Sequence, residues 1–361
     1  IYLLFFITLN LILSLDIISK TAFADNAVFQ KYVVVFSLGI KPEKEIEEAA
    51  ANRYNNHRKS HIDSPAAAQE KIYEMRFIMK RLLITGASGF LGSRTADFYA
   101  GEYDICAPAH TRLDITNLEN VYALFREFRP GFVIHCAAVS DLGMCEKDPE
   151  GSRRINVDGS RNIAAACAEF SAKCLLCGSD QVYSQNGRKG PHREEEPIDP
   201  PTVYGQEKKT AEEECLAANP DCVILRLSWM YDTGTKHAGE HGDFFRTLAA
   251  RLQASETFAY PTHDMRGITD VNEVIRNFRH ALEWNGGIYN FGSPNDRSTY
   301  ETVRAMLTSL GLDTGRLLKN EEAFASNPRD IRMDLQKSID GGITFSATLD
   351  ALTRHGRTFL K

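Results

Sequence analysis

The stretch Arg81-Leu-Leu-Ile-Thr85, followed at once by Gly86-Ala-Ser-Gly89-Phe-Leu-Gly92, decides the fold of this chain. A short apolar run that ends in a G-x-x-G-x-x-G turn and opens a helix is typical of a dinucleotide-binding βα unit. Glycine permits the tight turn and a close approach of backbone to pyrophosphate, while the helix N-terminus offers free N–H groups. We therefore expect a dinucleotide to be bound by Gly86, Ser88, Gly89, Phe90, Leu91 and Gly92.

Short apolar runs alternate with helical stretches from Met79 onwards. Strands are expected at Arg81–Thr85, Tyr103–Ala107, Phe132–Cys136, Lys173–Cys177 and Cys222–Leu227, and helices at Phe90–Ala100, Leu118–Phe128, Arg153–Phe170 and 203–219. Because the strands are apolar throughout, this alternation predicts an α/β fold: a Rossmann-type doubly wound parallel sheet covered by helices on both faces.

The pattern loosens beyond Trp229, where one short strand is expected at Ile288–Phe291. We expect residues 79–230 to form the dinucleotide-binding domain. Residues 231–361 are expected to form mainly a smaller substrate-binding lobe, with a segment that returns to the main sheet.

The first 78 residues do not fit this pattern. An apolar run, Ile1 to Leu15, precedes Ala22-Phe23-Ala24, which resembles the apolar region and cleavage site of a signal peptide but has no basic region before it. Met79 leads directly into the first strand, so we expect residues 1–78 to be an upstream extension or a misassigned start, outside the fold. The alternative is a genuine export signal or membrane anchor.

Charge and cysteine content narrow the class of protein. A formal net charge of −6 without a basic tract argues against nucleic acid or an anionic membrane as a partner of the fold predicted from Met79 onwards. The eight cysteines have no secreted-scaffold spacing, which predicts reduced thiols in a cytoplasmic protein. Cys174 and Cys177 form a C-x-x-C, but in a strand they would face opposite sides. No second such motif completes a zinc site, so no metal is expected.

The end of the second strand bears on the choice of nicotinamide cofactor. An NAD site usually has a carboxylate there, whereas this chain has Cys106-Ala-Pro-Ala-His110-Thr-Arg112. His110 and Arg112 can meet a 2′-phosphate with charge-assisted hydrogen bonds, which favours NADP(H), with NAD(H) as the alternative. Arg112 could instead stack on adenine or lie in solvent.

Leu113-Asp114-Ile115 follows this segment. Asp114 is expected to bind the adenine amino group, and Ile115 to pack on the ring. Asp114 could instead cap the next helical turn, with Thr116 and Asn117 as competing caps.

The segment Tyr204-Gly-Gln-Glu-Lys208 places a phenol and an ammonium four residues apart, on one face of a helix. The ammonium can stabilise the phenolate, which makes Tyr204 a usable proton donor. Ser179 follows an apolar strand and can hydrogen-bond a substrate carbonyl. Asn156 lies early in the preceding long helix.

A family resemblance rests on these residues together. GASGFLG, CAAVSD, INVDGSRN, SDQVY, PPTVYGQEK and RLSWMY occur here in the order and spacing of the extended short-chain dehydrogenases/reductases. More narrowly, the chain from Met79 resembles the dTDP-4-dehydrorhamnose reductases. Asn327 to Asp334 is similar, in degenerate form, to that subgroup's R-P-x-[ND]-x-x-L-D segment.

The resemblance implies a role for each matching residue. Tyr204 would be the proton donor, Lys208 would bind the nicotinamide ribose, and Ser179 would orient the carbonyl. Ala137, Ala138 and Asn156 would lie at the cofactor; Ser140, Asp180, Trp229 and Arg266 would lie at the substrate, with Arg266 on its diphosphate. Two departures concern the sugar: Gln181 stands where the subgroup has an aromatic, and Ala138-Val-Ser140-Asp replaces its A-A-Y-T.

The resemblance implies a reductase of a nucleotide-linked 4-keto-6-deoxy sugar that takes hydride from NADPH. One alternative is an NAD-dependent nucleotide-sugar epimerase or dehydratase, although Gln181 is not the acid that a dehydratase needs beside Asp180. Another is a non-catalytic NADP-binding subunit, like the regulatory subunit of methionine adenosyltransferase. The oligomeric state does not follow from the sequence, and a homodimer stays an open alternative.

Overall fold

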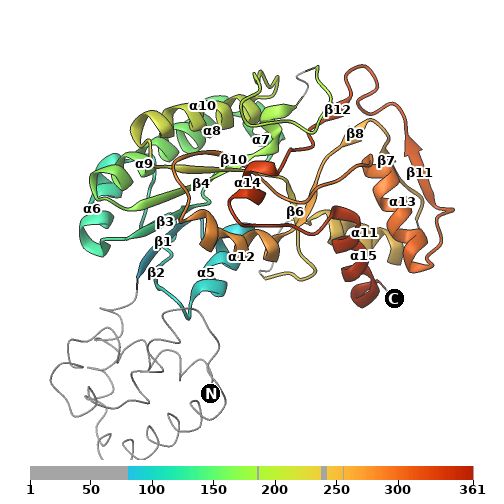
Figure 1. Cartoon of the computed structure of the whole chain (residues 1–361), viewed down its shortest axis with the longest axis horizontal. Coiled ribbons are helices and arrows are strands. Elements are labelled where there is room, and N and C mark those ends of the chain that lie inside the picture. Colours follow the sequence, from blue (N-terminus) through green and yellow to red (C-terminus); the bar gives the residue numbers. More distant parts are fainter. Residues whose placement is uncertain (1–79, 185–186, 237–241, 255, 361) are drawn as a thin grey trace, which may run out of the picture. The chain divides into compact units, whose positions relative to one another are not determined.

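A six-stranded parallel sheet forms the centre of the computed structural model, which describes residues 80–184, 187–236, 242–254 and 256–360 (Figure 1). Its strands are β1 (Arg81–Thr85), β2 (Asp104–Cys106), β3 (Phe132–His135), β4 (Lys173–Ser179), β5 (Val223–Leu227) and β10 (Gly287–Phe291). They lie in the order β10-β5-β4-β3-β1-β2, and every neighbouring pair is parallel. The predicted doubly wound sheet is confirmed. The expectations for residues 1–78 lie outside the described residues.

Helices cover both faces of this sheet (Figure 1). Helices α5 (Phe90–Tyr99) and α12 (Val271–Ala281) pack on one face, and α6 (Leu118–Phe128), α9 (Ser160–Glu169) and α10 (Val203–Ala218) pack on the other. Side chains of one strand alternate between the two cores, so Leu82 belongs to the first and Leu83 to the second. Cys174 and Cys177 likewise lie in different cores, because β4 is extended there.

The sheet has its switch point between β1 and β3. The chain runs from β1 to the edge strand β2 and then returns to the other side of β1. Ligands of open α/β sheets bind at the carboxyl ends of the strands beside such a point. The glycine turn after β1 and residues 136–140 after β3 flank that position.

The long helix expected at Arg153–Phe170 is wrong in one respect. The structure has α8 (Pro149–Arg153), a π-helical segment η2 (Arg154–Gly159) and then α9. Asn156 lies inside the π segment, and its side-chain amide hydrogen-bonds Val139 and Glu207, which are distant in sequence. Helical periodicity does not report such long-range bonds, and π-bulges often occur at functional sites.

A smaller lobe lies beyond β5 (Figure 1). It contains three two-stranded pairs: β6 (Trp229–Tyr231) with β9 (Ile268–Asp270), β7 (Phe258–Pro261) with β11 (Leu317–Asn320), and β8 (Asp264–Met265) with β12 (Arg329–Asp330). Helices α11 (Phe244–Gln253), α13 (Thr299–Leu310) and α15 (Thr348–Phe359) share a separate core with the first two of these pairs. The short helices α7 (Leu142–Lys147), η3 (Asp180–Tyr183) and α14 (Gln336–Asp340) complete the described elements.

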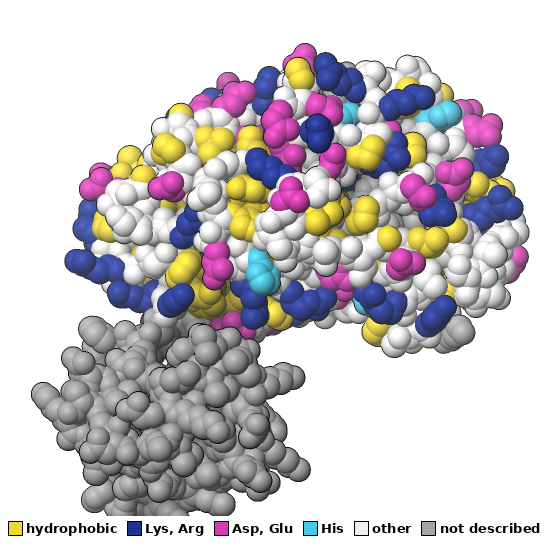
Figure 2. Space-filling model, in the orientation of Figure 1, with side chains coloured by type: hydrophobic (Ala, Val, Ile, Leu, Met, Phe, Trp, Pro, Cys, Tyr) yellow, Lys and Arg dark blue, Asp and Glu magenta, His cyan; other side chains and the backbone are white. Residues whose placement is uncertain are grey.

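On the face that Figure 2 shows, acidic and basic side chains are interspersed over the described residues. Neither sign of charge therefore forms a continuous field on that face. Among the described helices, none combines the length and the apolar character needed to cross a membrane.

Candidate active site

The glycine turn between β1 and α5 is packed too closely for larger residues. Gly86 has a φ of +66°, and an added Cβ would lie 2.6 Å from the backbone nitrogen of Ala137. A Cβ at Gly92 would lie 2.3 Å from the carbonyl oxygen of Gly86. Gly89 caps α5 without any side-chain hydrogen bond. The first N–H groups of α5 are thus left to a ligand, and the residues present fit the pyrophosphate of a dinucleotide.

Two adjoining cavities open beside this turn, of about 410 and 280 Å³, and they share Gly86, Gly89, Cys136 and Ala138 in their walls. The first is lined by these predicted site residues: Gly86, Gly89, Phe90, Leu91, Gly92, Ala138, Ser140, Ser179, Asp180, Tyr204, Lys208, Trp229 and Arg266. The second is lined by Ser88, His110, Asp114, Ile115 and Ala137, besides the shared glycines. The structure therefore brings together residues from both lobes around one continuous site.

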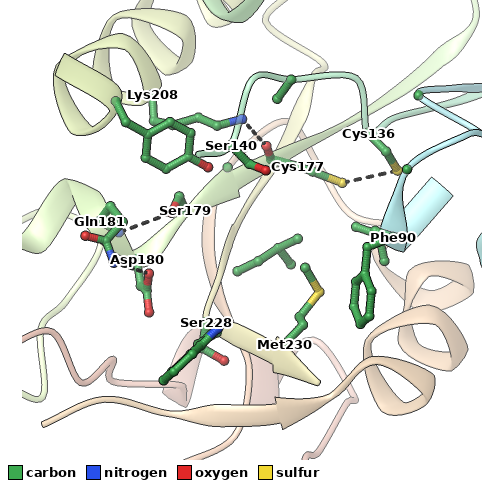
Figure 3. A pocket seen from close by; sticks show the side chains of 18 of the residues that line it. Phe90, Cys136, Ser140, Cys177, Ser179, Asp180, Gln181, Lys208, Ser228 and Met230 are labelled. Carbon is green, nitrogen blue, oxygen red and sulfur yellow. Dashed lines mark hydrogen bonds between the residues drawn. The ribbon is translucent and has the colours of Figure 1, made fainter. Parts of the chain in front are cut away.

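Ser179, Tyr204 and Lys208 meet in the first cavity, and Figure 3 shows Ser179 and Lys208 around the same space as Ser140. All three are buried, at 7, 7 and 5% exposure. The ammonium of Lys208 donates to the carbonyl oxygen of Cys177 (2.9 Å) and lies 5.7 Å from the centre of the Tyr204 ring. Thr202 caps α10 by accepting from the backbone N–H of Gly205, which fixes the start of the helix that carries both residues.

A buried polar cluster ties α10 to the loop after β3. The Glu207 carboxylate accepts from the Ser152 hydroxyl (2.5 Å) and from the Asn156 amide (2.7 Å). The Asn156 side chain also bonds both the N–H and the carbonyl of Val139. Asn156 is fully buried and is not among the residues that line either cavity, so its contacts are to protein. Glu207 was not predicted as a site residue, because the only sign of it in the sequence is an acidic residue next to Lys208.

A second buried network lies under the glycine turn. The Thr85 hydroxyl lies 2.6 Å from Nδ1 of His135, and Nε2 of His135 lies 3.0 Å from the Ser160 hydroxyl. Thr85 also accepts from the N–H of Ala137 (3.2 Å). Burial, with the nearby Lys208 charge, lowers the pKa of His135 to about 3. His135 is therefore neutral at neutral pH and links β1, β3 and the first residue of α9.

The wall opposite Tyr204 is charged. Arg266 donates to Asp180 (3.0 Å to Oδ2), and its guanidinium lies 4.9 Å from the centre of the Trp229 ring. Both charged groups are more than nine-tenths buried, and burial raises the pKa of the Asp180 carboxyl although Arg266 opposes the rise. The Nε of Arg266 and the Oε1 of Gln181 are buried without a hydrogen-bond partner among the described residues. Unpaired buried polar atoms are costly, and both of these atoms belong to residues that line the larger cavity.

The residues at the end of β2 divide into two groups. His110 and Asp114 line the smaller cavity, and Asp114 accepts from the N–H and hydroxyl of Thr116, which lowers the pKa of its carboxyl. The cap of α6 is Asn117, not Asp114. Arg112 is not among the lining residues of either cavity; it lies at the surface and pairs with Glu127 (2.9 Å).

The sheet, the glycine turn and the Ser179, Tyr204 and Lys208 set define an oxidoreductase of the extended short-chain dehydrogenase/reductase type. The model of one family, the RmlD substrate binding domain, matches residues 79–345. The chain belongs to this family.

Two relatives and one solved structure are similar to this chain over most of its length. A spore coat polysaccharide biosynthesis protein of Bacillus subtilis, SpsK, is 27% identical over 253 residues, which is 69% of this chain and 86% of the relative. A dTDP-4-dehydrorhamnose reductase of Mycolicibacterium smegmatis is 26% identical over 300 residues, which is 80% of this chain and 85% of the relative. The structure of a Bacillus anthracis dTDP-4-dehydrorhamnose reductase in complex with NADP superposes with a TM-score of 0.66 at 24% identity, over 77% of this chain and 97% of the other.

Proposed function

We propose that this protein is an NADPH-dependent reductase of a nucleotide-linked 4-keto-6-deoxy sugar, of the dTDP-4-dehydrorhamnose reductase kind. The observation that carries the proposal is the meeting of Ser179, Tyr204 and Lys208 in the wall of a cavity that begins at the glycine turn. The Mycolicibacterium smegmatis and Bacillus subtilis relatives support the sugar class, because their names concern dTDP-4-dehydrorhamnose and a spore coat polysaccharide.

Bound NADPH would supply the hydride for the carbonyl carbon, and this chain's residues would handle the proton. Tyr204 gives its phenolic proton to the carbonyl oxygen as negative charge develops there. Lys208, held at 2.9 Å by the Cys177 carbonyl, stabilises the phenolate that remains. Ser179 donates a hydrogen bond to the same oxygen and sets the angle of approach. The protein therefore supplies orientation and electrostatics rather than a covalent intermediate.

The wall opposite Tyr204 would hold the nucleotide-sugar. Arg266 presents a buried guanidinium with an unpartnered Nε to the diphosphate, and Trp229 supports it from one side. Gln181 stands where a dehydratase would need an acid, so the site favours reduction over dehydration. His110 and Arg112 would recognise the 2′-phosphate of NADPH, and Arg112 would leave Glu127 to do so.

The proposal also covers the cellular location and the oligomeric state of the protein. All eight cysteines are free thiols, which supports the reducing cytoplasm as the location. The homodimer left open by the sequence stays a prediction that sedimentation can check.

One assay tests the function. The full-length protein is mixed with NADPH or NADH and with dTDP- or GDP-linked 4-keto-6-deoxy sugars, and cofactor absorbance is followed. We expect NADPH oxidation that requires the dTDP sugar. NADPH binding without oxidation by any of these sugars would contradict a reductase and support a binding role.

A further inference from the structure

Two thiols face each other in the wall that the two cavities share. The sulfurs of Cys136 and Cys177 are 3.7 Å apart, and Figure 3 shows the two side chains pointing toward each other. Both line the larger cavity, and Cys136 also lines the smaller one. Neither sulfur has a part in the proposed reduction.

The backbone already has the spacing that a disulfide needs. Strands β3 and β4 are paired in parallel, with Ile134 opposite Leu175 and His135 opposite Leu176. The next pair in this register is Cys136 and Cys177. Neighbouring strands lie about 4.8 Å apart, which falls inside the range of about 4.4–6.8 Å between the Cα atoms of a disulfide. The sulfurs must still approach from 3.7 Å to about 2.05 Å, which rotates the two side chains and shifts the backbone that carries them locally.

The surroundings distinguish this pair from the chain's other cysteines. Cys167, Cys174, Cys215 and Cys222 belong to the core on the opposite face of the sheet, and none of them lines either cavity. A hydrogen bond to Cys177, together with burial, raises the pKa of the Cys136 thiol. The raised pKa favours the protonated form of Cys136, so Cys177, which lines the larger cavity, is the sulfur assigned to attack an oxidant first.

We propose that Cys136 and Cys177 form a redox-sensitive dithiol, which a peroxide converts to a disulfide when the dinucleotide is absent, and that the disulfide form binds the dinucleotide poorly. The thiolate of Cys177 attacks one oxygen of hydrogen peroxide, the O–O bond breaks, and the departing hydroxide is protonated to water. The resulting sulfenic acid is attacked by the sulfur of Cys136. The S–O bond breaks, and the hydroxyl leaves as water with the Cys136 proton. Two thiols and one peroxide give one disulfide and two waters.

The disulfide would disturb the cofactor site at two points. The carbonyl of Cys177 accepts the hydrogen bond that positions Lys208, so moving the end of β4 moves the ammonium. Cys136 and Ala137 lie against Gly86, where an added Cβ would be only 2.8 Å from the Cys136 carbonyl carbon. Any shift of these backbone segments as the sulfurs close therefore displaces the turn as well as Lys208. Conversely, a bound dinucleotide would cover both thiols and protect them.

The experiment uses the full-length reduced protein, treated with hydrogen peroxide in the presence and absence of NADP⁺. Remaining thiols are then blocked with N-ethylmaleimide, and peptide mass spectrometry identifies the joined cysteines. NADPH binding is measured by fluorescence, which requires no sugar substrate, so failure here is distinguishable from failure of the proposed function. We expect a Cys136–Cys177 disulfide that forms only without NADP⁺. NADPH affinity should fall by about tenfold or more, as for loss of one charge-assisted hydrogen bond, and recover with dithiothreitol.

Two variants make the test specific. Cys106→Ser is the matched control, because Cys106 is as buried as Cys177 (7 and 8% exposed) but is not among the lining residues of either cavity. The NADPH affinity of this variant should fall after peroxide treatment, as it does for the parent protein. For Cys136→Ser, the NADPH affinity after peroxide treatment should equal the affinity of the same variant before treatment. The proposal is overturned if the pair stays reduced, if the oxidised protein binds NADPH undiminished, or if Cys136→Ser loses affinity as the parent does.

Discussion

The cofactor wall of the site is built mainly from residues close together in sequence, whereas the sugar wall is assembled across the chain. Gly86 to Gly92 form one turn and the start of α5, and Tyr204 and Lys208 share one helix. By contrast, Asp180 and Arg266 form their buried ion pair across 86 residues. Short motifs can therefore carry the redox chemistry, whereas the geometry of the proposed sugar wall depends on how the smaller lobe packs.

The largest effect is expected at Tyr204. Tyr204→Phe removes the proton donor and keeps the ring, so kcat should fall about 10²–10⁴-fold, the usual contribution of positioned acid catalysis. NADPH affinity should be retained. Steady-state kinetics with the dTDP sugar measure the first quantity, and fluorescence titration measures the second. Normal turnover in this variant would remove Tyr204 from the mechanism.

The second-largest effect is expected at the glycine turn after β1. Gly92→Ala places a Cβ 2.3 Å from the Gly86 carbonyl oxygen, so the backbone must shift. We expect the activity to fall by about 10²-fold, the cost of a small misplacement in a positioned site, with NADPH affinity reduced. Gly234→Ala is the control, because an added Cβ there meets nothing within 4 Å. Equal behaviour of the two variants would show that close packing at the turn is not what binding requires.

A smaller effect should appear in the sugar wall. Arg266→Lys keeps the charge opposite Asp180 but loses the planar group over Trp229 and its unpartnered Nε. The KM for the sugar should rise about tenfold, the loss expected for one charge-assisted hydrogen bond, while NADPH affinity is unchanged. Arg297→Lys is a matched exposed control outside the cavity walls. A rise in the Kd for NADPH instead would place Arg266 at the cofactor.

The smallest effect separates the two nicotinamides. Arg112 must give up an exposed ion pair with Glu127 to meet a 2′-phosphate, so Arg112→Ala should weaken NADPH by only about fivefold and leave NADH unchanged. Glu127→Gln frees the guanidinium and should shift NADPH affinity in the opposite direction. Equal changes for both cofactors would mean that Arg112 does not recognise the phosphate.

Features set by residues close together in sequence were predicted, whereas features set by contacts between distant residues were missed. The sheet, the glycine turn and the Tyr204–Lys208 spacing are local patterns, and all of them appear in the structure. The π segment at Asn156 was missed because its amide bonds Glu207, 51 residues away. The pairing of Cys136 with Cys177, 41 residues apart, was hidden for the same reason. Arg112 was predicted at the cofactor from its position after β2, but its side chain can turn to Glu127 without changing the backbone pattern.

Transfer of labelled hydride tests the central claim most directly. The full-length protein is incubated with NADPH deuterated at the transferable position and a dTDP-4-keto-6-deoxy sugar, and the product is examined by mass spectrometry and NMR. Reduction predicts one deuterium at C4 of the sugar, with one NADP⁺ formed for each sugar consumed. Conversion of the sugar without net NADPH oxidation, or no conversion while NADPH binds, would contradict it.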